Sequence, residues 1–247
     1  MSTNHPIRID EFEKRIDEAL SLNERANELN KVENPPGVDR MSSAGRCVRE
    51  RWAAFRGLPL DPDKGFAVNP RMLRVFGLGH AIEDEIVRIL EDAGYVIEDS
   101  QREVGEGKWI GHIDGLIRDP NTFDPPRLFE AKSVNVRGFE EVQEIGLRAW
   151  RPGYYAQAQA YMHFLPGVDE CVFAIYCKDT SALYFELILY DVDEATRLQQ
   201  ESLLVTQESA VPPPKPEAAT SKSCQFCKWC DRSGWCWSAL AETVFDD

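Results

Sequence analysis

Three polar residues near the middle of the chain have the types and the spacing needed for metal-dependent chemistry. Glu130 and Lys132 are separated by one residue in the segment FEAK, and side chains alternate along a strand, so both are expected on one face. Asp114 lies sixteen residues before Glu130 in the segment GHIDG, where Gly115 allows a neighbouring strand to approach closely. If the two strands pair, Asp114 and Glu130 can share a divalent cation, and hard oxygen ligands favour Mg²⁺ or Mn²⁺.

Each of these pieces also has an ordinary structural interpretation. An acid and a lysine two residues apart are often a solvated ion pair, and an Asp-Gly pair is often a turn. A like-facing pair that is buried is costly unless it serves a purpose. In the catalytic interpretation, Lys132 orients or activates a metal-associated water or neutralises developing negative charge.

Two further positions can complete such a site. His80 follows the segment GLG in an otherwise apolar-periodic helix, where it is a structural histidine, a third metal ligand or a phosphate contact. Gln157 and Tyr161 are four residues apart and therefore share one helical face. That face is either a half-buried core surface or a polar and aromatic surface turned toward the site.

Hydrophobic periodicity and turn signals define the elements that must position these residues. Helices are expected over residues 9–31, 42–56, 71–93, 154–165 and 193–208, and strands over residues 95–104, 109–117, 128–134, 171–176 and 182–190. Residues 58–70 read as a proline-containing loop, and Gly94 is a C-cap signal for the helix before it. The mixture predicts an α/β core in which helices pack on a mixed sheet.

The order and spacing of these polar residues resemble the PD-(D/E)XK nuclease superfamily. More narrowly, they resemble its RecB-type branch of iron–sulfur exonucleases, which includes CRISPR-associated, AddB-like and phage-borne enzymes. The resemblance covers roughly residues 42–237 and implies a restriction-endonuclease-like fold, a mixed sheet flanked by helices. The roles that it implies are metal ligation by Asp114, Glu130 and His80, catalysis by Lys132, and placement of the DNA and the lysine by Gln157 and Tyr161. The proline of the superfamily name is absent, since Ile113 precedes Asp114.

The cysteines form a second group of candidate ligands. Four of the seven crowd into thirteen residues near the C-terminus: Cys224, Cys227, Cys230 and Cys236. C-x2-C spacing lets two thiolates hold one metal centre, so this cluster alone can form a zinc site. Cys47 lies far upstream, and Cys171 and Cys177 fall in a predicted strand where buried thiols are expected.

The same resemblance implies a different ligand set. Iron–sulfur nucleases of this kind use one cysteine before the nuclease core and three after it, spaced C-x2-C-x5-C. Cys227, Cys230 and Cys236 have that spacing, and Cys47 occupies the upstream position, with Cys224 as a substitute for one of them. A 4Fe-4S cluster on these residues would join the N- and C-terminal segments, and we expect it to be structural because such binding contributes folding free energy.

The stretch around Cys47 is the most basic in the chain. Arg46, Arg49, Arg51 and Arg56 are candidate contacts to the DNA backbone, with a solvated helix face as the alternative. Tyr161 is a further candidate DNA contact. The tryptophans near the cysteines can stack unpaired bases or pack around the cluster: Trp52, Trp229, Trp235 and Trp237.

The composition is that of a globular protein: 247 residues, 43% hydrophobic and 28% charged, with a formal net charge of −14. A negative chain opposes non-specific binding to a polyanion. However, acids concentrate at 83–99 and in the last predicted helix, whereas bases gather around Cys47 and recur beside the C-terminal cysteines at Lys222, Lys228 and Arg232. The charge is therefore compatible with a confined DNA channel.

We expect three parts: an N-terminal helical segment (1–41), a nuclease core that includes the Cys47 helix (42–210), and a linker with a cysteine-rich iron–sulfur segment (211–247). No apolar run approaches the roughly 18 residues of a membrane span, and residues 1–18 lack the apolar core of a secretory signal. We therefore expect no membrane partner and a cytoplasmic location, in a bacterial or phage-infected cell.

The function predicted from the sequence is that of a Mg²⁺- or Mn²⁺-dependent DNA exonuclease that hydrolyses phosphodiester bonds and is stabilised by a 4Fe-4S cluster. Its expected substrate is DNA with single-stranded ends or flaps. No helicase motif is present, so a helicase, recombination or CRISPR-adaptation partner would be a separate chain. The alternative is a non-catalytic DNA-binding or assembly subunit that keeps the nuclease fold and a zinc or iron–sulfur staple.

Overall fold

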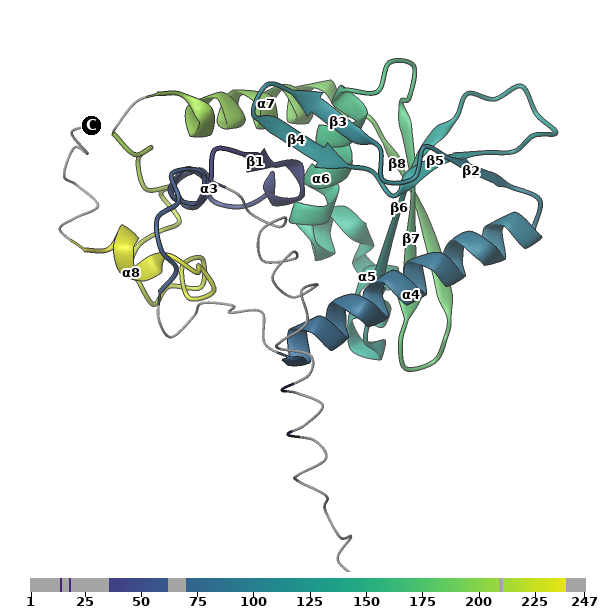
Figure 1. Cartoon of the computed structure of the whole chain (residues 1–247), viewed down its shortest axis with the longest axis horizontal. Coiled ribbons are helices and arrows are strands. Elements are labelled where there is room, and N and C mark those ends of the chain that lie inside the picture. Colours follow the sequence, from purple (N-terminus) through teal and green to yellow (C-terminus); the bar gives the residue numbers. More distant parts are fainter. Residues whose placement is uncertain (1–13, 15–17, 19–35, 62–69, 209–210, 239–247) are drawn as a thin grey trace, which may run out of the picture.

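The computed structural model describes residues 36–61, 70–208 and 211–238, together with positions 14 and 18 (Figure 1). The predicted helix at 9–31 lies outside these residues, apart from the two single positions. The helices that precede and flank the sheets are η1 (Met41–Ser43), α3 (Val48–Phe55), α4 (Pro70–Asp92), α5 (Val136–Trp150), α6 (Pro152–His163), α7 (Val192–Thr206) and α8 (Ser233–Cys236). Within the described ranges, no helix combines the length and the apolar character needed to cross a membrane.

Two sheets form the centre of the molecule. The larger has the order β2-β5-β6-β7-β8, in which β6 and β7 are parallel and the other neighbours are antiparallel. Its strands are β2 (Val96–Glu98), β5 (Gly115–Arg118), β6 (Arg127–Val134), β7 (Glu170–Cys177) and β8 (Leu183–Leu189). The smaller sheet has the order β1-β4-β3, built from β1 (Asp39–Arg40), β4 (Trp109–His112) and β3 (Glu103–Glu106).

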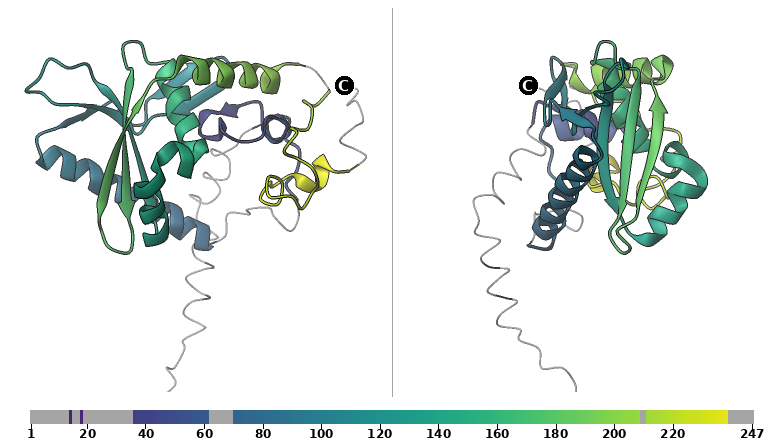
Figure 2. Two further views of the ribbon diagram at one scale, coloured as in Figure 1. Left: turned by 180° about the vertical axis from the view of Figure 1, so that it is seen from behind. Right: turned by 90° about the vertical axis from the view of Figure 1, so that its right-hand side faces the viewer.

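Helix α4 covers one face of the larger sheet. Ile82, Ile86 and Leu90 recur every fourth residue along α4 and pack against Phe129 and Ala131 of β6. Burial of each such aliphatic side chain contributes roughly 1.5–3 kcal/mol. Figure 2 shows α4, in blue, and the green helix α5 on opposite sides of this sheet.

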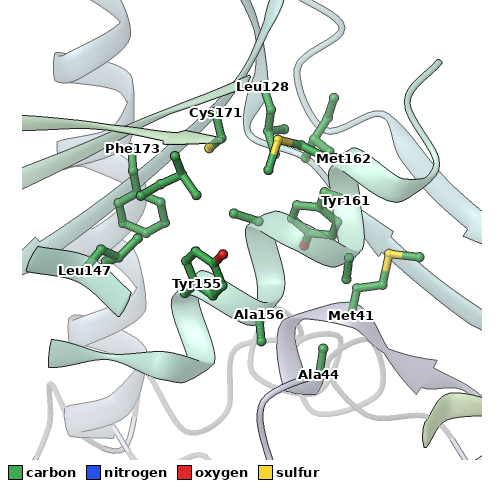
Figure 3. Packing of buried hydrophobic residues seen from close by; sticks show 14 of the residues in the cluster. Met41, Ala44, Leu128, Leu147, Tyr155, Ala156, Tyr161, Met162, Cys171 and Phe173 are labelled. Atoms are coloured by element: carbon green, nitrogen blue, oxygen red, sulfur yellow. The ribbon is translucent and has the colours of Figure 1, made fainter. Parts of the chain in front are cut away.

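Helices α5 and α6 cover the other face. Leu128 of β6 and Phe173 of β7 are fully buried there with Leu147 and Met162 (Figure 3). Residues of β6 therefore alternate between the two cores, so that Leu128 and Glu130 share the α6 side and Phe129 faces α4. This arrangement confirms the predicted fold class, a mixed sheet flanked by helices.

The structure divides two of the predicted strands. Residues 109–117 form β4 and β5, which belong to different sheets because the chain bends at Ile113 and Asp114. Residues 95–104 divide into β2 and β3, since Asp99 and Gln101 have φ values of 56° and 58° that a regular strand excludes. The catalytic candidate Asp114 thus lies at a crossing point between sheets.

Helix α5 is not among the elements predicted from the sequence. It is kinked at Gly146, where φ is 76° and ψ is 163°. The carboxylate of Glu186 on β8 accepts hydrogen bonds from the backbone N–H of Leu147 at 2.9 and 3.1 Å, and so supports the second half of the helix. Phe139 and Val142 lie three residues apart on its buried face, so a helical pattern was present in the sequence before the kink.

The C-terminal segment returns to helix α3. Figures 1 and 2 show α8 beside α3, away from the larger sheet. Asp61 joins the two: its backbone N–H donates to Asp231 at 2.8 Å, and its carboxylate accepts from Ser233 at 3.0 Å and from the N–H of Gly234 at 2.7 Å. These three hydrogen bonds fix the segment to the residues that follow α3.

Candidate active site and cysteine cluster

Asp114 lies in the bend between β4 and β5, beside strand β6. Gly115 pairs with Phe129 in the antiparallel β5–β6 ladder, which brings Asp114 opposite the next residues of β6. The Asp114 carboxylate accepts a hydrogen bond from the backbone N–H of Ala131 at 2.8 Å. A side chain at position 115 would come within 2.8 Å of Ile97 on the neighbouring strand β2. Glycine at position 115 therefore lets β2 lie close to β5.

Glu130 and Lys132 project to the same side, as strand alternation predicts. The Lys132 Nζ atom donates to Glu130 Oε2 at 3.2 Å and to Asp114 Oδ2 at 3.5 Å. The Glu130 side chain is fully buried, whereas those of Asp114 and Lys132 retain 12% and 24% of their exposure. The three groups therefore form one cluster that reaches solvent on the side of Lys132 and Asp114.

Helix α6 supports this cluster from above the sheet. Gln157 Nε2 donates to Glu130 Oε2 at 2.9 Å and to the Tyr161 hydroxyl at 3.3 Å. Gln157 and Tyr161 therefore share one face of α6, as predicted, and Gln157 points toward Glu130. A side chain on Gly111 would come within 2.4 Å of the Tyr161 ring, which explains the glycine.

The predicted contact between Tyr161 and DNA does not fit its position. Tyr161 is only 2% exposed and lies in the core beside Met162 and Met41 (Figure 3). Because α6 packs directly on the sheet, the face that carries Gln157 and Tyr161 is covered. Tyr161 therefore contacts the cluster indirectly, through the hydrogen bond that its hydroxyl accepts from Gln157.

The electrostatics of the cluster are those of crowded, buried carboxylates. Burial and repulsion from Asp114 raise the pKa of Glu130 to about 8, although Lys132 acts in the opposite direction. Burial opposes the charge of Lys132, but the attraction of Glu130 and Asp114 prevails and raises the pKa of the lysine. Lys132 is thus positively charged at neutral pH, and a further cation would relieve the repulsion between the carboxylates.

Glu83 on α4 is a fourth member of the site that the sequence analysis missed. Burial and the nearby Asp114 raise the pKa of Glu83 to about 7, and its carboxylate accepts from Gln101 at 3.1 Å. The predicted ligand His80 lies one helical turn earlier, with a side chain that is 61% exposed and Nδ1 4.0 Å from Glu83 Oε2. Glu83, rather than His80, is therefore the residue of α4 that is affected by the charge of Asp114. In the sequence, its position three residues after His80, on the same face of the helix, could have indicated it.

The carboxylates suit a hard divalent cation bound together with substrate. Glu130 Oε1 is buried and has no hydrogen-bond partner among the described residues, a costly condition that a cation would remove. In the same part of the chain, no three His, Cys, Asp or Glu side chains converge into a complete metal cage. Mg²⁺ does not need one, since it is usually held by one or two carboxylates, waters and substrate phosphates.

The predicted cluster ligands line a common cavity. Cys47, Cys227, Cys230 and Cys236 surround a cavity of about 300 Å³ between α3 and the C-terminal segment. The thiol of Cys230 lies close enough to Cys47 and Cys236 to be affected by their charge. Cys224 does not line the cavity, but its thiol lies within hydrogen-bond distance of the Cys227 thiol, and its Sγ atom lies 3.6 Å from the carbonyl oxygen of Ala218.

The thiols that line the cavity and the thiol of Cys224 differ in their readiness to ionise. Burial raises the pKa of Cys47 and of Cys227, and raises that of Cys230 to about 12. Backbone hydrogen bonding at Ser221 instead lowers the pKa of Cys224 to about 6. Since only thiolates bind metal, a metal centre in the cavity would displace protons as it binds.

The cavity wall carries an indole N–H group that could donate a hydrogen bond to a ligand. Trp235 lines it, and its buried Nε1–H has no hydrogen-bond partner within the described residues. Trp235 also stacks on the buried Trp52, with ring centroids 6.0 Å apart. Trp229, in contrast, is 76% exposed. Hydrogen bonds to the sulfurs are a feature that proteins supply to iron–sulfur clusters. Among the described residues, however, no three cysteines converge closely enough to hold a metal ion as they stand.

Arg51 lies in the interior, which corrects the prediction that it contacts DNA. Its side chain is 2% exposed and donates to both carboxylate oxygens of Asp39, at 2.6 and 3.1 Å. Asp39 also accepts from Ser202 at 2.7 Å, so the pair joins α3, β1 and α7. Arg56 donates to the carbonyl oxygen of Gln207 at 3.0 Å and likewise serves the packing of these helices.

Arg49 is also buried, whereas Arg46 reaches solvent. Arg49 donates to the carbonyl oxygen of Pro213 at 2.6 Å and lies over the Trp235 ring, so its role is to hold the C-terminal segment. Arg46 keeps 46% of its side-chain exposure and pairs with Asp231 at 3.1 Å. Of the four arginines predicted to contact DNA, Arg46 is therefore the one with an exposed side chain, and Arg56 is half-buried.

The fold is similar to that of solved structures at low sequence identity. The crystal structure of SSO0001 matches with a TM-score of 0.51 and 18% identity, covering 94% of this chain and 100% of that chain. The alkaline exonuclease LHK-Exo from Laribacter hongkongensis gives a TM-score of 0.48 and 16% identity, over 68% of this chain and 86% of that chain. Its complex with dAMP gives 0.46 and 17%, over 69% and 85%.

No family model matches the sequence, and no curated protein does either. The likeness to solved structures concerns the fold. Together with the mixed sheet and its flanking helices, it defines the chain as a restriction-endonuclease-like α/β protein. The chemistry must be argued from the site itself.

Proposed function

We propose that the chain is a Mg²⁺- or Mn²⁺-dependent nuclease of the PD-(D/E)XK type that hydrolyses phosphodiester bonds at the ends of DNA. The observation that carries this proposal is the buried Glu130. Its Oε1 atom has no hydrogen-bond partner in the described structure, while Lys132 and Asp114 lie beside its other oxygen. A fold gains nothing from such a group unless a ligand completes it.

Asp114 and Glu130 would hold the cation, and the negative charge of Glu83 would add to the attraction for it. When bound, the ion would polarise the scissile phosphate and lower the pKa of an attacking water. Lys132 remains protonated, so it stabilises the negative charge that develops on the phosphate and orients the water. Gln157 fixes Glu130 Oε2 and leaves Oε1 for the ion. The 3′-oxygen leaves, and the products carry 5′-phosphates.

The second part of the proposal is a structural 4Fe-4S cluster on Cys47, Cys227, Cys230 and Cys236. It is supported by the cavity that these four residues share and by the position of Cys224 outside it. The cluster would anchor residues 211–238 to α3 and hold Arg46 beside the start of α6, where Gly45 would clash with Gly153 if it carried a side chain.

The nuclease proposal is tested by incubating anaerobically purified protein with end-labelled single-stranded DNA and Mg²⁺ or Mn²⁺. We expect hydrolysis that EDTA abolishes and that Glu130→Gln reduces by at least about a hundredfold. Glu106→Gln, at the exposed end of β3, is the matched control and should keep full activity. If wild-type protein and Glu130→Gln are equally inert, the chain is a non-catalytic binding subunit.

The cluster is tested on the same sample by its visible absorbance and by its iron and sulfide content. We expect about four irons per chain, the number of a 4Fe-4S cluster. A colourless protein that contains zinc would contradict the iron–sulfur part and leave the nuclease part untouched.

A further inference from the structure

The outer edge of strand β8 lacks the features that usually protect the edge of a sheet. β8 lies at one end of the larger sheet, and no described strand pairs with its outer side. It spans Leu183–Leu189 without lysine, proline or glycine, and its register with β7 continues without a bulge. Natural proteins protect such an edge with charge, proline, a bulge or a short strand. The opposite edge, β2, is protected in this way, since it has only three residues and ends in the charged Glu98.

Half of the backbone groups of β8 point toward this outer edge. The carbonyl oxygen of Ala182, just before the strand, accepts from the N–H of Cys177 on β7 at 2.9 Å. Backbone groups alternate along an antiparallel strand, so those of Phe185 and Leu187 point away from β7. The carbonyl of Leu189 points the same way and is engaged by a side chain of α6. Among the described residues, no partner is found for the N–H and C=O of Phe185 and Leu187.

The side chains along this edge are apolar and exposed. Phe185, Leu187 and Leu189 alternate along β8 and are 43%, 52% and 62% exposed. They share the face of the sheet on which α4 packs, since Phe185 lies opposite Ala174 of the α4 core. Helix α4 covers β6 and Ala174 but leaves these three side chains uncovered. A contiguous apolar row of this kind is typical of an interaction surface.

The edge is also nearly free of charge in a strongly acidic protein. The one acidic or basic residue of β8 is Glu186, and its carboxylate accepts from the backbone N–H of Leu147 on the other face of the sheet. Two copies of a chain with a formal net charge of −14 repel each other over most of their surface. A basic partner would gain nothing from an uncharged edge, whereas a second copy meets the least repulsion there.

From the unprotected edge, the apolar row and the lack of charge, we propose that β8 pairs antiparallel with β8 of a second copy. The two larger sheets then form one continuous sheet, and the interface is self-complementary, as a twofold axis requires. With Leu187 opposite its counterpart, Phe185 lies opposite Leu189 of the second copy. This register also places each Glu186 opposite Ile188 and so keeps the two carboxylates apart. The inference does not depend on the nuclease proposal.

The pairing determines how the two candidate active sites are arranged. The twofold axis of an antiparallel pair is perpendicular to the sheet, so equivalent faces of the two copies lie on the same side. Glu130 is on β6, which is separated from the edge by β7 and β8. The two β6 strands are then five strand spacings apart, about 24 Å at about 4.8 Å each. Both catalytic clusters therefore lie on one side of the joined sheet.

The test measures the mass of the full-length chain by sedimentation equilibrium, from about 1 μM to about 200 μM. The protein is purified anaerobically with a reductant, so that no disulfide links two copies. A seven-residue strand is about 23 Å long, so the interface lies near the lower end of stable interface sizes, and we expect a dissociation constant of about 1–100 μM.

The decisive variant places a lysine on the edge strand. Leu187→Lys should weaken association at least about tenfold, because it puts two like charges opposite each other. Leu203→Lys is the matched control on α7, where the leucine is 63% exposed, and should keep the wild-type dissociation constant. Both positions are exposed, so circular dichroism of the two variants should match that of the wild type.

Two further measurements identify the edge as the interface. Raising NaCl from about 0.1 M to about 1 M shortens the Debye length from about 10 Å to about 3 Å and should strengthen the association of two acidic chains. The amide protons of Phe185 and Leu187 should exchange at least about tenfold more slowly at the highest concentration than at the lowest. In Leu187→Lys this difference should disappear.

A wild-type chain that stays monomeric at about 200 μM overturns the inference. So does a dimer that survives Leu187→Lys, that is weakened by salt, or that leaves the amides of Phe185 and Leu187 unprotected. Protection of these amides in a monomer would show that another part of the same chain covers β8, and it overturns the inference as well. None of these measurements involves cleavage of DNA, so each result leaves the nuclease proposal to its own test.

Discussion

The catalytic cluster and the cysteine cavity are assembled in different ways. Glu130 and Lys132 lie on a central strand, and Gln157 lies on a helix that packs directly on that strand. The cysteines come from the turn before α3 and from a C-terminal segment held by polar contacts and a short helix. The first site is therefore formed by the packing of the core, whereas the second would depend on the metal centre proposed for its thiols.

This difference predicts which substitutions abolish hydrolysis and which release the C-terminal segment from the fold. Substitutions in the catalytic cluster should abolish hydrolysis and leave the fold intact, because hydrophobic packing holds the strands. Substitutions of cluster cysteines should release the C-terminal segment and affect activity only through that release. The predictions that follow test this contrast from the largest effect to the smallest.

Asp114→Asn should give the largest loss, a reduction in kcat of at least about a hundredfold to a thousandfold. The asparagine oxygen can still accept the hydrogen bond from Ala131, so the β5–β6 junction should hold. Circular dichroism and the melting temperature check that the variant is folded. A variant that retains more than half of the wild-type rate contradicts the assignment of Asp114 as a metal ligand.

Loss of a cluster cysteine should have the next largest effect. Cys230→Ser is expected to lose the bound iron and to expose residues 211–238 to limited proteolysis, because the cysteines join them to α3. Cys224→Ser is the matched control and should keep iron and resistance, since Cys224 does not line the cavity. Equal loss of iron in the two variants would show that Cys224 is a ligand.

The buried pair of Arg51 and Asp39 provides a test of the scaffold between the two sites. Arg51→Gln leaves a buried carboxylate without its partner and should lower the free energy of unfolding by about 3–5 kcal/mol. Arg118→Gln removes an exposed arginine whose partner Glu98 is also exposed, and should cost less than about 1 kcal/mol. Urea denaturation of both variants measures the difference, and equal losses contradict a structural role for Arg51.

The acidic cluster predicts a smaller effect of pH on the metal-free protein. The pKa values of Glu83 and Glu130 are raised from 4.5 to about 7 and about 8, so the folded state retains protons that the unfolded chain has released. Stability should therefore fall between about pH 4.5 and pH 8 in EDTA, with a decrease of a few degrees in melting temperature. Mn²⁺ should restore much of it at pH 8.5, and Glu130→Gln should flatten the profile.

A melting temperature in EDTA that rises with pH over this range would contradict the raised pKa values. Failure of Mn²⁺ to stabilise the wild-type protein relative to Glu130→Gln would contradict the cation site itself.

The catalytic cluster could be predicted from the sequence because its contacts follow local periodicity. Alternation along β6 places Lys132 beside Glu130, and four-residue spacing along α6 places Tyr161 beside Gln157. Glu83 could not be found in this way, since its approach to Asp114 depends on how α4 lies across the sheet.

The arginines near Cys47 illustrate the opposite case. Their charge predicts exposure, yet Arg49 and Arg51 are buried because the return of the C-terminal segment and of α7 covers them. Burial of this kind depends on tertiary contacts with residues more than a hundred positions away, and no local pattern reports it. The kink at Gly146, supported by Glu186 on another strand, escaped prediction for the same reason.

The central claim is that Asp114, Glu130 and Lys132 form a catalytic centre, and single-turnover cleavage of 3′-labelled, 5′-phosphorylated single-stranded DNA with Mn²⁺ tests it most directly. Wild-type protein and Lys132→Ala should be compared at equal iron content, with Lys108→Ala as the exposed-lysine control. We predict a rate for Lys132→Ala that is at least about a hundredfold lower than those of the wild type and the control. Equal rates for all three proteins, or no EDTA-sensitive cleavage by any of them, would contradict the account.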